Sequence, residues 1–128
     1  MSNWTHVAGI IRVDSIRFDE EIDFDKVLGK ECLFDAPLSV WDDVESNPDK
    51  YLPMGSKGSL QKTIWVNPDK SCMDAYVVSI FGDLRNHDSA KDIIDWFKKK
   101  CEKLSVRNAV INVWNECYGT ETWAYEWE

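Results

Sequence analysis

The sequence predicts an α+β fold in which helices cover one face of a sheet, and two patterns carry this prediction. The first is a strand, helix and strand in succession: Ala75–Phe81 is rich in β-branched and aromatic residues, Ser89–Leu104 has helical periodicity, and Val106–Val113 returns to a β pattern. The second is the turn chemistry of Pro68–Ser71, which separates Ala75–Phe81 from another strand-like segment, Leu60–Asn67. These two strands are expected to pair as an antiparallel hairpin.

The helix over 89–104 is the clearest single element. Ser89 or Asp88 can cap its start, and the Lys98–Lys100 run lies near its negative end. A crossover of this length normally joins two strands that run parallel in one sheet. Its apolar residues fall within an arc of about 100° and should face the core: Ile93, Ile94, Phe97, Cys101 and Leu104.

The first strand is expected at Trp4–Ile16, where an apolar run passes into alternation. Gly9 in its middle indicates a bulge or close packing by a helix. A short acidic helix follows within Phe18–Gly29, with Asp23 as its cap and Gly29 as its end.

From residue 30 to residue 59 the chain reads as a long connection that contains one amphipathic helix between Pro37 and Asn47. Leu60, Ile64 and Val66 are expected to point inward from the next strand. The chain ends in a second hairpin, whose last strand lies within Glu121–Glu128.

The element order is therefore β, α, an insertion, β, β, α, β, β. Without the last strand this is the β-α-β-β-α-β order of ferredoxin-like domains, in which two helices pack on one face of an antiparallel sheet. We expect a single α+β domain over 1–128, with an extra C-terminal strand and an insertion after the first helix. The other sheet face must be covered, paired with another subunit, or used in binding.

Composition narrows the functional class. Hydrophobic residues make up 44% of the chain and charged residues 30%, which is typical of a globular protein. A net charge of −8 disfavours direct nucleic-acid binding, because phosphate recognition needs an excess of Lys and Arg. No apolar run could span a membrane, no signal peptide is evident, and the four Cys form no CxxC pair. These features predict a cytoplasmic protein with free thiols and without a zinc site.

No group of residues in the sequence predicts catalysis. The two histidines, His6 and His87, stand in unrelated segments, and linear order does not show that either meets the Ser or Cys and the acid that a catalytic triad needs. Gly55–Gly58 lacks the spacing of a P-loop. We therefore assign no catalytic residue, no metal ligand and no cofactor, and we favour a non-enzymatic protein.

The aromatic residues are the most informative candidates for binding. Seven Trp is a high count for 128 residues, and Trp is favoured at recognition surfaces. The rings either cover the second sheet face as core or form an exposed platform. Candidate binding residues lie in the C-terminal hairpin, in the second predicted strand, in the insertion and in the segment before the 89–104 helix: Trp114, Trp123, Tyr125, Trp127, Trp65, Trp41, Lys57, Arg85 and His87.

The acidic residues form a second candidate surface. Asp19–Asp25 and Asp42–Glu45 are rich in carboxylates, which are either a solvated face or a surface that meets a basic partner. The second hypothesis requires the two segments to lie on one exposed surface without Lys or Arg partners.

The chain also resembles the small uncharacterised proteins of bacteriophages and mobile elements. The resemblance is carried by Ser2–Asp14, Tyr51–Ser56 and Val78–Asp88. It implies a binding or inhibitory role in a bacterial cell and transfers no catalytic residue.

Two functional hypotheses follow. The leading one is a non-enzymatic binding module that contacts a protein partner through aromatic and acidic surfaces, or that forms a homodimer through its terminal strand. The alternative is a protein that binds a small molecule or nucleotide, or a minor hydrolase. Its pocket would lie between the sheet and the 30–59 insertion and would be lined by Trp41, Trp65, Lys57, Arg85 and His87.

Overall fold

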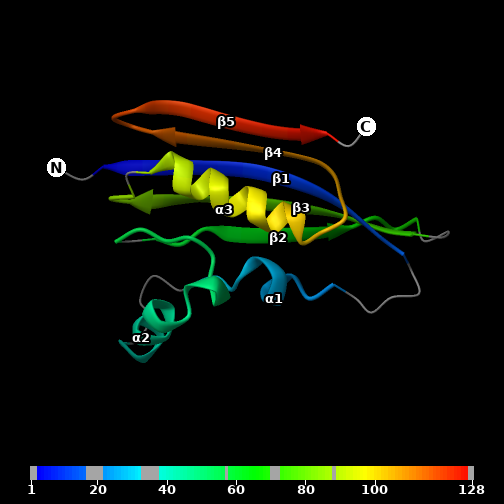
Figure 1. Ribbon diagram of the computed structural model, residues 1–128, viewed down its shortest axis with the longest axis horizontal. Helices are drawn as coiled ribbons and strands as arrows, with labels where there is room; N and C mark the ends of the chain where they lie inside the picture. Colours follow the sequence, from blue (N-terminus) through cyan, green and yellow to red (C-terminus); the bar gives the residue numbers. More distant parts are fainter. Residues whose placement is uncertain are drawn as a thin grey trace.

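The computed structural model describes residues 3–16, 22–32, 38–56, 58–69, 73–87 and 89–126. Five strands form one antiparallel sheet in the order β2-β3-β1-β4-β5. The strands are β1 (Trp4–Ile16), β2 (Gln61–Val66), β3 (Met73–Arg85), β4 (Val106–Asn115) and β5 (Gly119–Glu126). The α+β class and both expected hairpins are confirmed, and β1 lies in the middle of the sheet (Figure 1).

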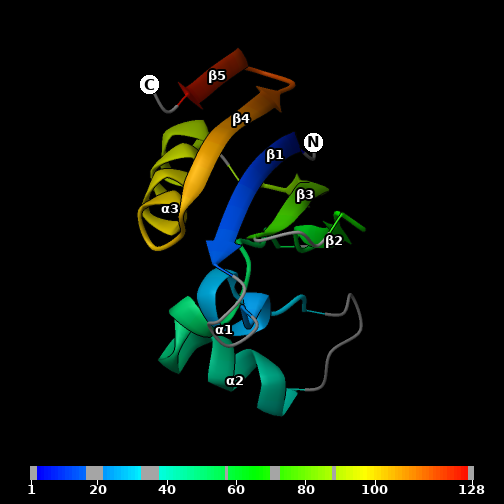
Figure 2. The same cartoon turned by 90° about the vertical axis from the view of Figure 1, so that its right-hand side faces the viewer.

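The helix α3 (Ala90–Glu102) lies against one face of this sheet (Figure 2). Ser89 caps it by accepting a hydrogen bond from the Asp92 amide at 3.2 Å, as its position predicts. Its expected apolar stripe is confirmed, because Ile93, Ile94, Phe97 and Cys101 are buried. The helix connects β3 to β4, which run parallel to each other with β1 between them.

Buried Lys100 departs from this pattern. It was expected in a basic run at the helix end, yet it is only 5% exposed. Burial lowers the pKa of its ammonium, and repulsion from Lys103 acts in the same direction.

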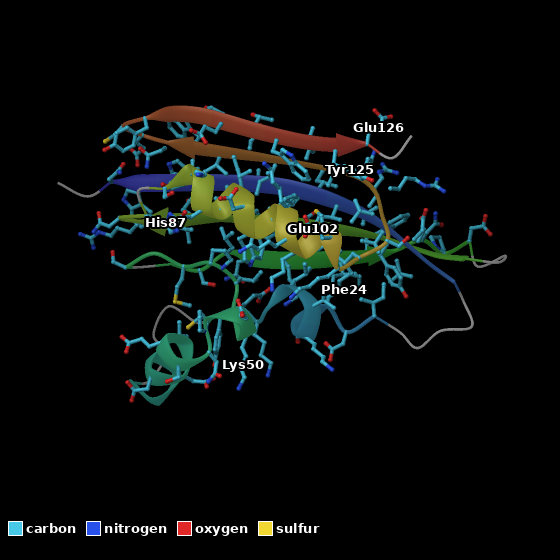
Figure 3. The ribbon with its side chains drawn as sticks, in the orientation of Figure 1. Phe24, Lys50, His87, Glu102, Tyr125 and Glu126 are labelled. Atoms are coloured by element: carbon cyan, nitrogen blue, oxygen red, sulfur yellow. The ribbon has the colours of Figure 1, made fainter. Side chains whose placement is uncertain are left out.

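The segment between β1 and β2 contains α1 (Phe24–Leu28), α2 (Leu38–Ser46) and a 3-10 helix, η1 (Pro48–Lys50). Asp23 caps α1 and Gly29 follows it at a φ of 112°, as expected for a helix end. Phe24, which is labelled in Figure 3, and Leu28 belong to the hydrophobic core, whereas α2 lies farther from the sheet (Figure 2). No helix in the described ranges is long and apolar enough to span a membrane.

The structure corrects two local expectations. Gly9 was expected to mark a bulge or close packing by a helix; it pairs regularly with Ile80 and Ile111, so no bulge forms there, and it is buried on the helix side of the sheet. The irregularity in β1 falls later, between Arg12 and Val13. Ile64 and Val66 were expected to point into the core, and both are exposed. They lie on the helix side of β2, but β2 is an edge strand, and α1 contacts it earlier along the strand, where Asp25 pairs with Lys62.

Candidate functional site

The candidate site is the sheet surface opposite α1 and α3, here called the open face. In β1 the buried side chains are at odd positions, such as Val7 and Ile11, so His6, Ala8 and Ile10 point away from the helices. Strand register extends the open face across β2, β3, β4 and β5. In Figure 2 none of the drawn elements covers this side of the sheet.

Large apolar side chains gather on the open face. Trp65 on β2 is 54% exposed, Phe81 on β3 43%, Ile10 on β1 45%, Val110 on β4 38% and Trp114 on β4 48%. These residues come from four of the five strands, so the sheet itself assembles the patch. Contiguous apolar surface of this kind marks an interaction site more often than plain solvent-facing surface.

The middle of the open face carries no charge. Two rows of paired residues cross all five strands there, and each row combines apolar with neutral polar side chains. The first row is Gln61, Phe81, Ala8, Asn112 and Thr122, and the second is Thr63, Ser79, Ile10, Val110 and Ala124. We call these two rows the neutral band, because they contain no charged residue although charged residues make up 30% of the chain.

A polar cluster flanks the neutral band at the Trp114 end. The rings of His6 and Trp114 stack with centroids 4.8 Å apart. His6 Nδ1 lies 2.5 Å from Oδ1 of Asp83, and its Nε2 lies 3.6 Å from Oε1 of Glu116. The two carboxylates orient the imidazole, which in turn supports the indole of Trp114. The ring therefore projects from the sheet in a defined position.

The other end of the neutral band is hollowed. A depression of about 570 Å³ lies over β1, β4 and β5, with Ile10, Arg12, Asn108, Val110 and Ala124 among its lining residues. Beyond it, Arg107 Nε forms an ion pair with Asp14 at 2.9 Å. The open face thus has an aromatic projection at one end and a depression at the other.

The C-terminal hairpin divides its aromatic residues between the two faces. Trp114 lies on the open face, whereas Trp123 and Tyr125 lie on the helix side, because their partners Ile111 and Ala109 point to the core. Trp123 is half-buried, and its ring contacts Phe97 edge to face at 5.8 Å. Trp123 therefore packs against the core on the helix side, and not on the second sheet face to which the core interpretation assigned it.

Trp123 and Tyr125 also line a pocket of about 390 Å³ between β5 and the end of α3. Lys98 Nζ lies 5.7 Å from the centroid of the Trp123 ring, and Glu102, four residues further along α3, also lines the pocket. Figure 3 shows Glu102 at the end of α3 and Tyr125 toward the end of β5.

Among the described residues that were predicted to line one pocket beside the insertion, Trp65 lies apart from Arg85 and His87, whereas Arg85 lies beside Ser56 of the insertion. Trp65 pairs with Val77 and Arg85 with Trp4, so the two are separated by eight residues of β3, roughly 26 Å. His87 lies in the turn after β3, where its carbonyl oxygen accepts a hydrogen bond from Thr5 at 2.6 Å. Lys57, Trp127 and the side chain of Trp41 lie outside the described residues.

The expected acidic surface is mixed in charge where the structure describes it. A depression of about 510 Å³ beside α1, α2 and η1 is lined by four acids, three lysines and Tyr51: Asp23, Asp25, Asp43, Asp49, Lys26, Lys30 and Lys50. Asp25 forms an ion pair with Lys62. Hydrogen bonds from Tyr51 and Asn47 lower the pKa of Asp43. Residues 19–21 lie outside the described ranges.

Sequence reasoning named Trp65 and Trp114 but missed Ile10, Phe81, Val110 and His6. The sequence contained a signal for them. In β1 and β4 apolar residues occur at both odd and even positions, and side chains at odd and even positions point to opposite faces of the sheet, so some apolar residues had to face away from the helices. Within the described ranges, no group of three or more His, Cys, Asp and Glu side chains could hold a metal ion. No protein-family model matches the chain, and neither curated proteins nor solved structures give a match.

Proposed function

We propose that this chain is a non-enzymatic binding module that contacts a protein partner through the open face of its sheet. The observation that carries the proposal is the exposed apolar patch of Ile10, Trp65, Phe81, Val110 and Trp114 on an uncovered sheet face. Large exposed apolar patches rimmed by polar residues are characteristic of interaction surfaces, and aromatic residues supply much of the binding energy in such contacts. A binding or inhibitory role is also what the resemblance to small bacteriophage proteins implies.

The architecture supports a ferredoxin-like assignment for the first four strands. A β-α-β-β-α-β chain with right-handed crossovers produces an antiparallel sheet in the order 2-3-1-4, and this chain has that order with β5 added beside β4. We also propose action in the cytoplasm. The free thiols of Cys32, Cys101 and Cys117 suit a reducing compartment.

Site-specific photo-crosslinking tests the proposal. A photoreactive phenylalanine analogue replaces Phe81 on the open face, and in a control protein it replaces Tyr118 in the β4–β5 turn, which is 77% exposed. We expect adducts with a discrete protein in a bacterial extract from position 81 and much fewer from position 118. Mass spectrometry of the adducts identifies the partner, and a second copy of the chain would give an adduct of twice the monomer mass.

A matched pair of variants locates the contact. Val110 on the open face and Val66 on the helix side are 38% and 40% exposed, so Val110→Lys and Val66→Lys alter equally accessible sites. The adduct from position 81 should be lost in Val110→Lys and retained in Val66→Lys. The proposal is wrong if position 81 gives no more adduct than position 118, or if Val110→Lys leaves the adduct unchanged.

Small-molecule binding is a second candidate function, and the pocket beside Trp123 and Tyr125 favours it. The walls combine apolar and aromatic groups with Lys98 and Glu102, which suits a compact organic ligand. A thermal-shift screen of nucleotides and metabolites tests this function, because a ligand that binds the folded state raises the melting temperature. A genuine hit should lose its shift in Trp123→Ala and keep it in Val110→Lys.

A further inference from the structure

We propose that the partner of the open face is a second copy of this chain, bound face to face about a two-fold axis. The axis would lie between the two sheets, run across the strands, and pass over Gly9 of β1 and Ile111 of β4, which pair directly. This inference rests on the binding function proposed above and specifies its partner. Four features of the open face support it: its size, its charge, its shape and the position of its charged ends.

The open face is large enough for a stable dimer. Five strands at about 4.8 Å spacing give a width of roughly 24 Å, and the ten residue steps from Trp4 to Asp14 give a length of roughly 33 Å. The resulting area is about 800 Å², which is what each partner typically contributes to a stable protein interface. An isologous dimer would therefore bury a surface of standard size.

The charge of the open face favours a partner of the same kind. The whole chain has a net charge of −8. If its partner were basic, electrostatic complementarity would favour a contact surface that is itself acidic. The neutral band at the middle of the contact contains no charged residue, so two copies of an acidic chain meet there without repulsion between like charges. Several acids lie instead beside α1, α2 and η1.

The shape of the open face is complementary to itself under this symmetry. Trp114 lies three residues beyond Ile111 on β4, and Asn108, which lines the depression, lies three residues before it. Rotation about an axis over Ile111 exchanges these two levels. Each Trp114 ring would then enter the depression of the other copy, where Ile10 and Val110 supply apolar contact.

The charged ends select the direction of the axis. Asp83 is level with His6, three residues from Gly9 on one side, and Arg12 lies three residues from Gly9 on the other side. A two-fold axis across the strands brings Asp83 near Arg12 of the other copy. A two-fold axis along the strands would instead place residues at the same position along the strand direction opposite one another, so that like charges would face each other. No ion pair among the described residues includes Arg12, so it is available for this contact.

Sedimentation equilibrium measures the self-association directly. We expect the wild-type chain to approach twice its 14.9 kDa mass at micromolar concentration. Ile10→Lys should weaken the dimer about 100-fold or more, because the symmetric interface then buries two unpaired ammonium groups. Ile64→Lys is the matched control: Ile64 is 37% exposed against 45% for Ile10, it lies on the opposite face, and its substitution should leave the dimer intact.

A charge exchange tests the direction of the axis. Arg12→Asp and Asp83→Arg should each weaken the dimer about tenfold or more, since each places like charges opposite one another. The double variant restores an opposite pair and should recover most of the loss. Asp83→Arg also removes the contact with His6, but that contact is equally absent from the double variant, so recovery cannot come from it.

The outcomes separate this inference from the proposed function. A chain that stays monomeric to millimolar concentration overturns the second copy as partner, while the crosslinking at position 81 still decides whether the open face binds another protein. A dimer that survives both Ile10→Lys and Trp114→Ala overturns the face-to-face arrangement, and its contact lies elsewhere, for example at the β5 edge. A dimer weakened by Arg12→Asp without recovery in the double variant contradicts the proposed axis.

Discussion

Replacing Asn115 should destabilise the protein far more than replacing Asn112, although both lie on β4. Asn115 is 2% exposed, and its amide nitrogen donates to Thr5 Oγ1 at 2.9 Å. Its Oδ1 accepts from the backbone amides of Cys117 at 2.8 Å and Tyr118 at 3.0 Å. This side chain therefore holds the β4–β5 turn to the start of β1, beside Trp114.

The magnitude follows from these contacts. Asn115→Ala removes three hydrogen bonds worth about 1 kcal/mol each and leaves polar groups without partners near the turn. We expect a loss of about 3 kcal/mol in the free energy of unfolding. Asn112 is exposed and accepts one hydrogen bond from Thr122, so Asn112→Ala should cost about 0.5 kcal/mol or less.

Urea unfolding followed by circular dichroism, at one fixed protein concentration, measures both variants. Thr5→Val removes the acceptor of Asn115 and the donor to the His87 carbonyl. Combined with Asn115→Ala it should cost about 1 kcal/mol less than the sum of the single changes, because the two variants remove one shared hydrogen bond. Equal losses for Asn115→Ala and Asn112→Ala, or strict additivity with Thr5→Val, would refute this account of the turn.

Three further outcomes are expected. Gly55→Ala should lower the free energy of unfolding by about 2 kcal/mol, because its Cβ would lie 2.3 Å from the Arg85 carbonyl oxygen; urea unfolding measures this. Lys100→Met should stabilise the protein by about 1 kcal/mol, since the buried ammonium is replaced by an apolar chain of similar length. Its depressed pKa means that the unfolded chain binds more protons just below pH 10.5, so wild-type stability should rise with pH there, and the rise should be smaller in Lys100→Met. Peptide mass spectrometry after brief alkylation near pH 8 should find Cys117 modified and Cys101 protected, because burial raises the pKa of the Cys101 thiol to about 11.

Controls make these outcomes decisive. A Cβ at Gly119 meets no atom within 4 Å, so Gly119→Ala reports only the strain of a φ of 86° and should cost less than Gly55→Ala. Lys99→Met changes an exposed neighbour of Lys100 and should alter stability little. Equal effects within either pair would contradict the structural explanation, as would alkylation of Cys101 as fast as that of Cys117.

Local chemistry determined much of the fold. The arc of Ile93, Ile94, Phe97 and Cys101 identified the buried side of α3, and Ser89 and Asp23 marked the starts of two helices. These predictions were correct because helical periodicity and capping depend on residues within one or two turns of each other. Alternation along a strand likewise assigned most side chains of β1 and β4 to one of two faces.

The position of each strand depended on long-range packing. Ile64 and Val66 follow an inward pattern but are exposed, because β2 is an edge strand and α1 contacts it at Lys62, before these two residues. The open face is also a tertiary property: Ile10, Phe81 and Val110 are distant in sequence and meet only because β1 lies between β3 and β4. The sequence determines on which side of its own strand a side chain lies. The pairing of distant strands determines which side chains lie next to it, and a binding surface is made of side chains from several strands.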